Sequence, residues 1–108
     1  MQTDRQSISD KIYSVVARTP KGTVTTYGAV AKRAGIGSPR LVGYYLHRNP
    51  DPENIPCHRV VDAQGNLSRS YAFGGLRGQK QGLQTDGVVV EKGKVRLSVY
   101  AWQISTEP

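Results

Sequence analysis

The sequence contains no long hydrophobic run and only one cysteine. No apolar stretch approaches the roughly 18 residues of a membrane-spanning helix, and the polar start Met1 to Arg5 is unlike a secretory signal peptide. We therefore expect a cytoplasmic protein without membrane association. One cysteine excludes an internal disulfide, and one cysteine with two histidines lacks the paired spacing of a structural zinc site. No metal or other cofactor is expected.

Acidic residues are also missing between Lys11 and Pro50. This block holds seven basic residues: Lys11, Arg18, Lys21, Lys32, Arg33, Arg40 and Arg48. Elsewhere eight basic residues balance eight acidic ones, so the block carries the whole net charge of +7. Clustered cations attract phosphates and release condensed counterions, which favours nucleic acid as the partner. The alternative is that a pI near 9.9 only keeps a small protein soluble.

The composition predicts one globular domain over residues 1–108. Apolar residues make up 37% of the chain and are spread along its whole length. This fraction suits a folded domain better than a disordered chain. The sequence has no internal repeats and no composition change that would mark a second domain.

The first half of the chain has the patterns of three short helices, at about residues 7–18, 27–34 and 38–47. Ser7, Thr26 and Ser38 are the expected N-caps, because their hydroxyls can accept from the free amides of a first turn. Gly35 is expected to end the second helix. The last two helices would form a helix-turn-helix inside the acid-free block, which strengthens the DNA-binding interpretation.

The second half predicts shorter elements. Val60 and Val61 form an extended segment, residues 67–75 an ordered loop and residues 76–85 a helix weakened by two glycines. Alternating apolar residues over 88–99 predict a small C-terminal β-hairpin.

Cys57 is the one candidate nucleophile of its type, and His58 follows it directly. A cysteine reacts as the thiolate, which a nearby histidine or cation favours. Adjacent residues on an extended strand point to opposite faces, so a tight turn at Pro56 would be needed for the two to cooperate. The alternative is a small buried apolar residue.

The segment IPCHRVV, residues 55–61, resembles the PCHRV active-site signature of the O6-alkylguanine-DNA alkyltransferases. These proteins repair DNA by accepting an alkyl group irreversibly on the signature cysteine. Further motifs resemble the family in the same order over about residues 7–87. They are Thr26-Tyr27-Gly28 at the first helix of its DNA-binding motif, Arg40-Leu41-Val42-Gly43 in its recognition helix, Arg48-Asn49-Pro50 at its asparagine hinge, and Tyr71, Phe73 and Gly74 in the loop over the flipped base.

This resemblance implies a mostly helical α/β fold, a winged helix-turn-helix that binds double-stranded DNA through the minor groove. A thiolate cannot reach the alkyl carbon of O6-alkylguanine inside the base stack, so the nucleotide must be extruded. By similarity, Tyr27 would crowd the phosphate and hydrogen-bond the extruded base, and Arg40 would fill the gap in the stack. The residues expected at phosphates are Lys32, Arg33 and Arg48, and those expected at the base also include Asn49, Arg59, Val60, Tyr71 and Phe73.

For the transfer, the resemblance makes Cys57 the nucleophile and His58 the base that deprotonates it through a water. The family orients this histidine with a glutamate, and the matching position holds Asp86. Because aspartate is one methylene shorter, the sequence leaves open whether the carboxylate reaches His58.

Two further interpretations stay open. We expect no N-terminal domain of the kind usual in full alkyltransferases, because the sequence is closer in size to the alkyltransferase-like proteins. Their C-terminal segment resembles Val95 to Trp102. Those proteins bind the lesion without transfer and flag it for nucleotide excision repair, but they typically replace the cysteine that this chain keeps. A transcriptional regulator is the remaining alternative. We predict a monomeric, nucleoid-associated protein that transfers the alkyl group to Cys57.

Overall fold

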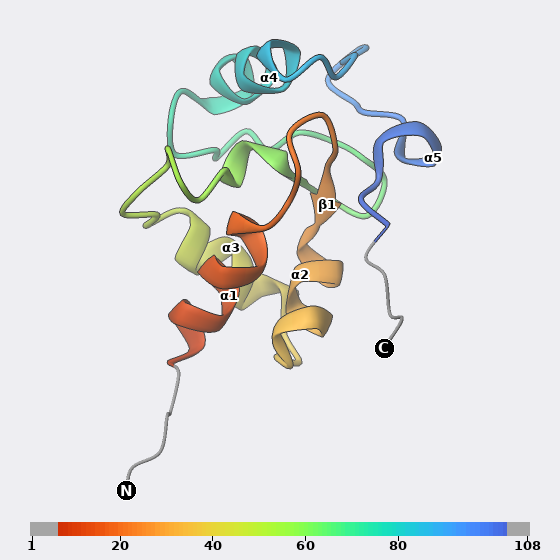
Figure 1. The fold of residues 1–108 in the computed structure, drawn as a ribbon. Coiled ribbons are helices and arrows are strands. Elements are labelled where there is room, and N and C mark those ends of the chain that lie inside the picture. The colour runs from red at the N-terminus through yellow and green to blue at the C-terminus, as the bar shows by residue number, and fades with distance from the viewer. Residues whose placement is uncertain (1–6, 104–108) are drawn as a thin grey trace, which may run out of the picture.

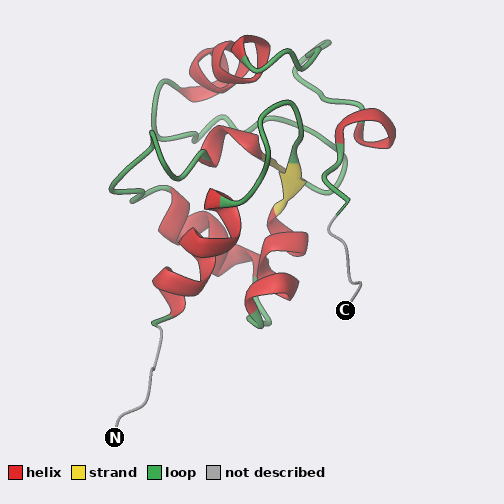
Figure 2. Ribbon diagram, viewed as in Figure 1, coloured by secondary structure: helices red, strands yellow, loops and turns green. Residues whose placement is uncertain are grey.

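The computed structural model describes residues 7–103, in which short helices surround a two-stranded sheet (Figures 1 and 2). The elements in chain order are α1 (Ile8–Ala17), β1 (Thr25–Thr26), α2 (Tyr27–Ala34), α3 (Pro39–Leu46), the 3-10 helix η1 (Cys57–Arg59), β2 (Val60–Val61), α4 (Gly75–Thr85) and α5 (Leu97–Tyr100). Between residues 7 and 103 no helix has the length and apolar character needed to cross a membrane.

The first three helices begin and end where their capping residues predict. Ser7 Oγ accepts from the amide of Asp10 at 3.1 Å, and Thr26 Oγ1 accepts from that of Ala29 at the same distance. Ser38 caps α3 in the same way, and Pro39 follows at its first position. Gly35 ends α2 with a φ of 74°, a left-handed conformation that glycine adopts without steric cost.

Two hydrophobic clusters lie on either side of the small sheet. The first is packed between α1, α2 and α3 and contains Ile12, Val15, Val16, Val30, Ala31, Val42, Leu46, Cys57 and Val60. The second gathers residues of the C-terminal half: Val24, Val61, Leu67, Leu83, Val88, Val90 and Val95. β1 and β2 pair in parallel, with Thr25 opposite Val60. Because strand side chains alternate between faces, the neighbours Val60 and Val61 tie the two clusters together.

The predicted C-terminal hairpin forms only at its turn. Glu91 and Lys94 make a single antiparallel bridge, whereas residues 97–100 form helix α5 instead of a strand. The backbone groups that a hairpin would pair internally bond elsewhere: Val95 N donates to Gly65 O at 2.8 Å, and Tyr100 O accepts from Val24 N at 2.9 Å. Val88, Val90 and Val95 are therefore spaced for burial in the second cluster and not for a two-stranded ladder, and Val99 is exposed on α5.

Candidate functional site

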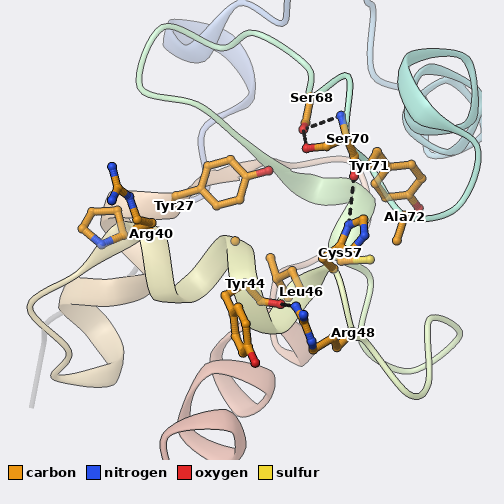
Figure 3. Close-up of a pocket in the computed structure, with 13 residues that line it drawn as sticks. Tyr27, Arg40, Tyr44, Leu46, Arg48, Cys57, Ser68, Ser70, Tyr71 and Ala72 are labelled. Carbon is orange, nitrogen blue, oxygen red and sulfur yellow. Dashed lines mark hydrogen bonds between the residues drawn. The ribbon is translucent and has the colours of Figure 1, made fainter.

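A pocket of about 660 Å³ opens between the exposed side of α3, the start of η1 and the loop 68–72 (Figure 3). Figure 3 shows Arg40 and Tyr27 on one side of it and Cys57 and Tyr71 on the other. The volume falls in the range of pockets that bind small organic groups. The pocket lies where the sequence places its nucleophile.

Cys57 stands in the pocket wall at the first position of η1, with 5% of its surface exposed. The tight turn that the sequence requires at Pro56 is present, because the amide of Arg59 donates to Pro56 O at 3.0 Å. Burial raises the pKa of the Cys57 thiol, although hydrogen bonds with the side chains of Asn49 and Tyr71 act in the opposite direction. The thiol is therefore protonated at neutral pH and needs a base before it can react.

The imidazole of His58 contacts the end of α4 and does not line the pocket. Its Nε2 lies 2.8 Å from Oδ2 of Asp86, the residue that follows α4 directly. The shorter carboxylate thus reaches the histidine. If Nε2 carries the proton donated to Asp86, the lone pair of the neutral ring is on Nδ1, the tautomer that a general base needs.

Asp86 also binds the guanidinium of Arg59. Arg59 Nε donates to Asp86 Oδ2 at 2.7 Å, and Arg59 Nη1 donates to Thr19 O at 2.8 Å. Burial acts to raise the pKa of Asp86, but the hydrogen bonds from Arg59 and His58 outweigh it, and this pKa lies below its usual range. Asp86 is therefore a carboxylate at neutral pH, shared between His58 and a fixed cation.

Three residues of α4 hold His58 and Asp86 in place, a role that the sequence does not indicate. The side chain of Gln79 is 1% exposed and donates to His58 O at 3.2 Å and to Val60 O at 2.8 Å, while its own carbonyl accepts from Ser68 N. A Cβ on Gly82 would lie 3.0 Å from the His58 ring, and one on Gly78 would lie 2.1 Å from Phe73 O. At Gly78 only glycine permits this approach, whereas a Cβ on Gly82 would require the His58 ring to shift. The two glycines that the sequence predicts to weaken this helix are thus the residues that let it pack closely against its neighbours.

Two interactions fix the rim of the pocket. The guanidinium of Arg48 lies 3.8 Å from the centre of the Tyr44 ring, and His47 Nδ1 lies 3.1 Å from Ser70 O in the loop.

Tyr44 is 50% exposed, whereas its neighbour Tyr45 packs against the first cluster. Neighbouring helical residues sit about 100° apart, so one buried and one exposed tyrosine are expected.

Two tyrosines in the pocket lining, Tyr27 and Tyr71, keep their hydroxyl protons. Burial raises the pKa of Tyr27, against a hydrogen bond with the Ser68 side chain that lowers it. Burial also raises the pKa of Tyr71, and the neighbouring Cys57 adds to the effect. Both phenols can therefore donate hydrogen bonds to a bound group.

Other residues predicted to contact DNA or the base lie outside the pocket lining: Lys32, Arg33, Asn49, Arg59, Val60 and Phe73. Lys32 and Arg33 are exposed on α2, and Val60 is fully buried in β2. The side-chain Nδ2 of Asn49 donates to Ile55 O at 2.7 Å, which closes the turn before Cys57. Phe73 packs edge-on against Tyr71 with ring centres 5.7 Å apart.

In residues 7–103 no three histidine, cysteine or acidic side chains gather where they could hold a metal ion.

Comparison with known proteins gives the family. Residues 7–88 match the family model of the 6-O-methylguanine DNA methyltransferase DNA-binding domain. This chain belongs to that family.

Among its relatives, a DNA base-flipping protein of Vibrio parahaemolyticus is 41% identical over 95 residues, which cover 86% of this chain and 93% of that protein. A bifunctional methyltransferase/endonuclease of Picrophilus torridus is 38% identical over 90 residues, and the match covers 82% of this chain but only 30% of that protein. The crystal structure of a Schizosaccharomyces pombe alkyltransferase-like protein in complex with damaged DNA containing O6-carboxymethylguanine superposes with a TM-score of 0.81. It has 29% sequence identity, and the match covers 90% of this chain and 95% of that one.

Proposed function

We propose that this protein recognises O6-alkylguanine in double-stranded DNA and accepts the alkyl group on Cys57. The observation that carries the proposal is the buried thiol of Cys57 in the wall of a pocket that is large enough to hold a base. A histidine that is hydrogen-bonded to a carboxylate follows Cys57 directly. The lesion as ligand is supported by a relative of nearly the same length, whose structure was solved with DNA containing O6-carboxymethylguanine.

DNA would bind across the outer side of α3. The protein would act as a winged helix-turn-helix that enters the minor groove. Arg40 is exposed at the first turn of α3 and lines the pocket beside Tyr27. From there Arg40 would fill the space that the extruded guanine leaves, which offsets part of an unstacking cost of a few kcal/mol. Tyr27 would hydrogen-bond the extruded base, and Arg48 on the rim would contact phosphate without reading sequence.

The reaction would use Cys57 in the pocket wall and the hydrogen-bonded pair of His58 and Asp86, which lies outside the pocket lining. The Nδ1 atom of His58 takes the proton of the Cys57 thiol through a water, while Asp86 holds the imidazolium that forms. The thiolate sulfur attacks the alkyl carbon, so that an S–C bond forms and the C–O6 bond breaks. The electron pair of that bond stays on the guanine, which takes up a proton. The thioether is not cleaved again, so each molecule reacts once.

Two features favour a second candidate, a lesion sensor without transfer. Burial disfavours the Cys57 thiolate, and Arg59 takes a share of the Asp86 charge that would otherwise stabilise protonated His58. A sensor would hold the lesion and recruit nucleotide excision repair proteins. In either role we propose a monomer that works at the nucleoid in the cytoplasm.

The two candidates differ in one measurable product. A duplex with one O6-methylguanine is incubated with the protein, and the intact protein mass is recorded together with lesion affinity. A gain of one methyl group, absent in Cys57→Ser, supports transfer. Tight binding at unchanged mass assigns the sensor role instead. Equal affinity for damaged and undamaged duplex overturns lesion recognition altogether.

A further inference from the structure

A second hollow, of about 250 Å³, lies between α1 and α2, away from the Cys57 pocket. Six residues line this second hollow, which we call the basic hollow: Lys11, Ser14, Val15, Arg18, Arg33 and Ala34. None of them lines the first pocket. The proposed reaction gives this hollow no role.

Its charge is of one sign. Lys11 and Arg18 stand seven positions apart on α1 and therefore on one face of the helix, and Arg33 faces them from α2. No acidic side chain lines the hollow, and the ion pairs found within residues 7–103 all involve Asp86. Three cations around one small hollow repel each other, and a bound anion would relieve that repulsion.

Favourable interactions with helix dipoles do not explain why all three cations lie at this hollow. Arg18 and Arg33 stand at the C-terminal ends of their helices, where a positive charge is favourable. Lys11 lies close to the N-terminal end of α1, where a positive charge is unfavourable. What the three residues share is the hollow itself.

The basic hollow faces away from the outer side of α3, so a duplex bound there would not reach Arg33, which the sequence predicts at phosphate. α3 buries Val42 and Leu46 against α1 and α2 and exposes Arg40, Tyr44 and Arg48 on its other side. The groove between α1 and α2 therefore lies across the first cluster from the outer face of α3, and α1 and α2 stand in front of α3 in Figure 1. DNA has a persistence length of about 150 base pairs, so one duplex on α3 does not bend around to the hollow.

We propose that the basic hollow binds an acidic segment of a partner protein while DNA occupies the α3 face. The guanidinium groups of Arg18 and Arg33 match the bidentate geometry of a carboxylate. Val15 and Ala34 supply an apolar lining for the methylene groups of a glutamate, or for an apolar residue beside it. A phosphodiester has no such apolar part, and this favours a peptide over a second duplex.

The test uses the full chain and a short fluorescein-labelled peptide rich in Glu, Asp and Leu, with binding followed by fluorescence anisotropy. The hollow variant is Lys11→Ala/Arg18→Ala, which removes two cations of the hollow and leaves Arg33, a residue expected at phosphate, unchanged. The matched control is Arg77→Ala/Lys80→Ala. It removes two exposed cations from α4, so its net charge equals that of the hollow variant. Circular dichroism checks that both variants remain folded. Titrations are repeated with saturating unlabelled duplex.

We expect the hollow variant to bind the peptide about tenfold more weakly, since two charge-assisted contacts are lost. The control should change the affinity less than about twofold, because exposed cations elsewhere contribute only general attraction, and the duplex should not displace the peptide. Equal loss in both variants would mean general attraction to a basic chain and would overturn the proposal. So would displacement by duplex, no binding to the wild type, or a hollow variant that weakens duplex binding instead. None of these outcomes depends on alkyl transfer, so failure here leaves the Cys57 reaction untouched.

Discussion

His58 Nε2 lies 2.8 Å from Asp86 Oδ2 because α4 packs against the imidazole through a glycine. Gly82 precedes Asp86 by one helical turn, so both face the histidine. With no side chain at position 82, the helix end comes near enough for the Asp86 carboxylate to reach the imidazole.

Replacing Asp86 with Asn should lower stability in a pH-dependent way. The variant leaves the mostly buried guanidinium of Arg59 without its anion, at a cost of about 2–3 kcal/mol near neutral pH. Because the pKa of Asp86 is lowered in the folded state, its stabilisation is fully present above about pH 4 and is lost as the pH falls through the folded value.

Urea unfolding of wild type and Asp86→Asn at about pH 7 and pH 3 measures this effect. The gap between the two proteins should shrink at the lower pH. A gap of the same size at both pH values would mean that the carboxylate charge does not stabilise the fold.

Replacing Gly82 with Ala should slow alkyl transfer while the fold survives. The new Cβ would lie 3.0 Å from two carbons of the His58 ring, so the ring must shift away from Asp86. A methyl group added at Gly28 in α2 would meet nothing within 4 Å, so Gly28→Ala serves as the stability control, where alanine should add about 0.5–1 kcal/mol. Single-turnover transfer rates and urea midpoints report the two effects. An unchanged transfer rate in Gly82→Ala would show that the ring position does not matter.

Replacing Gln79 with Leu should destabilise the protein by about 2–4 kcal/mol, because buried backbone groups lose their partners. The groups concerned are the amide of Ser68 and the carbonyl of Val60. Gln81 is exposed on the same helix, and Gln81→Leu should stay within about 0.5 kcal/mol of wild type. Equal effects of the two substitutions on the free energy of unfolding would contradict the bracing role of Gln79.

Arg40→Ala should weaken discrimination between a duplex with O6-methylguanine and an undamaged one. An inserted side chain acts only where a base is extruded, whereas a phosphate contact acts on both duplexes. Lys32→Ala, on the exposed side of α2, is the comparison and should reduce both affinities equally. If Arg40→Ala also reduces both affinities by the same factor, Arg40 only contacts phosphate.

Much of the fold follows from local signals in the sequence. Ser7, Thr26 and Ser38 define helix starts because a hydroxyl at an N-cap has one local partner. The prediction of a C-terminal hairpin is wrong beyond its turn, since alternating valines are equally compatible with a strand and with irregular segments that bury every second side chain. The parallel pairing of β1 with β2 joins residues 35 positions apart in sequence and has no local signature.

The candidate site is predictable where one motif holds its residues, as at Cys57, His58 and Arg59. The resemblance also supplies Asp86, but whether its carboxylate reaches His58 depends on how closely α4 packs, which composition does not reveal. Gln79 leaves no signal, because a glutamine on a polar helix is normally solvated.

The most direct test of alkyl transfer is the mass of the Cys57 peptide after one turnover. The protein is mixed with an equimolar duplex that contains one O6-methylguanine, digested, and analysed by tandem mass spectrometry. We expect one methyl group on the sulfur of Cys57 and a matching amount of restored guanine in the DNA. A protein that binds the lesion tightly and leaves both Cys57 and the O6-methylguanine unchanged would contradict transfer.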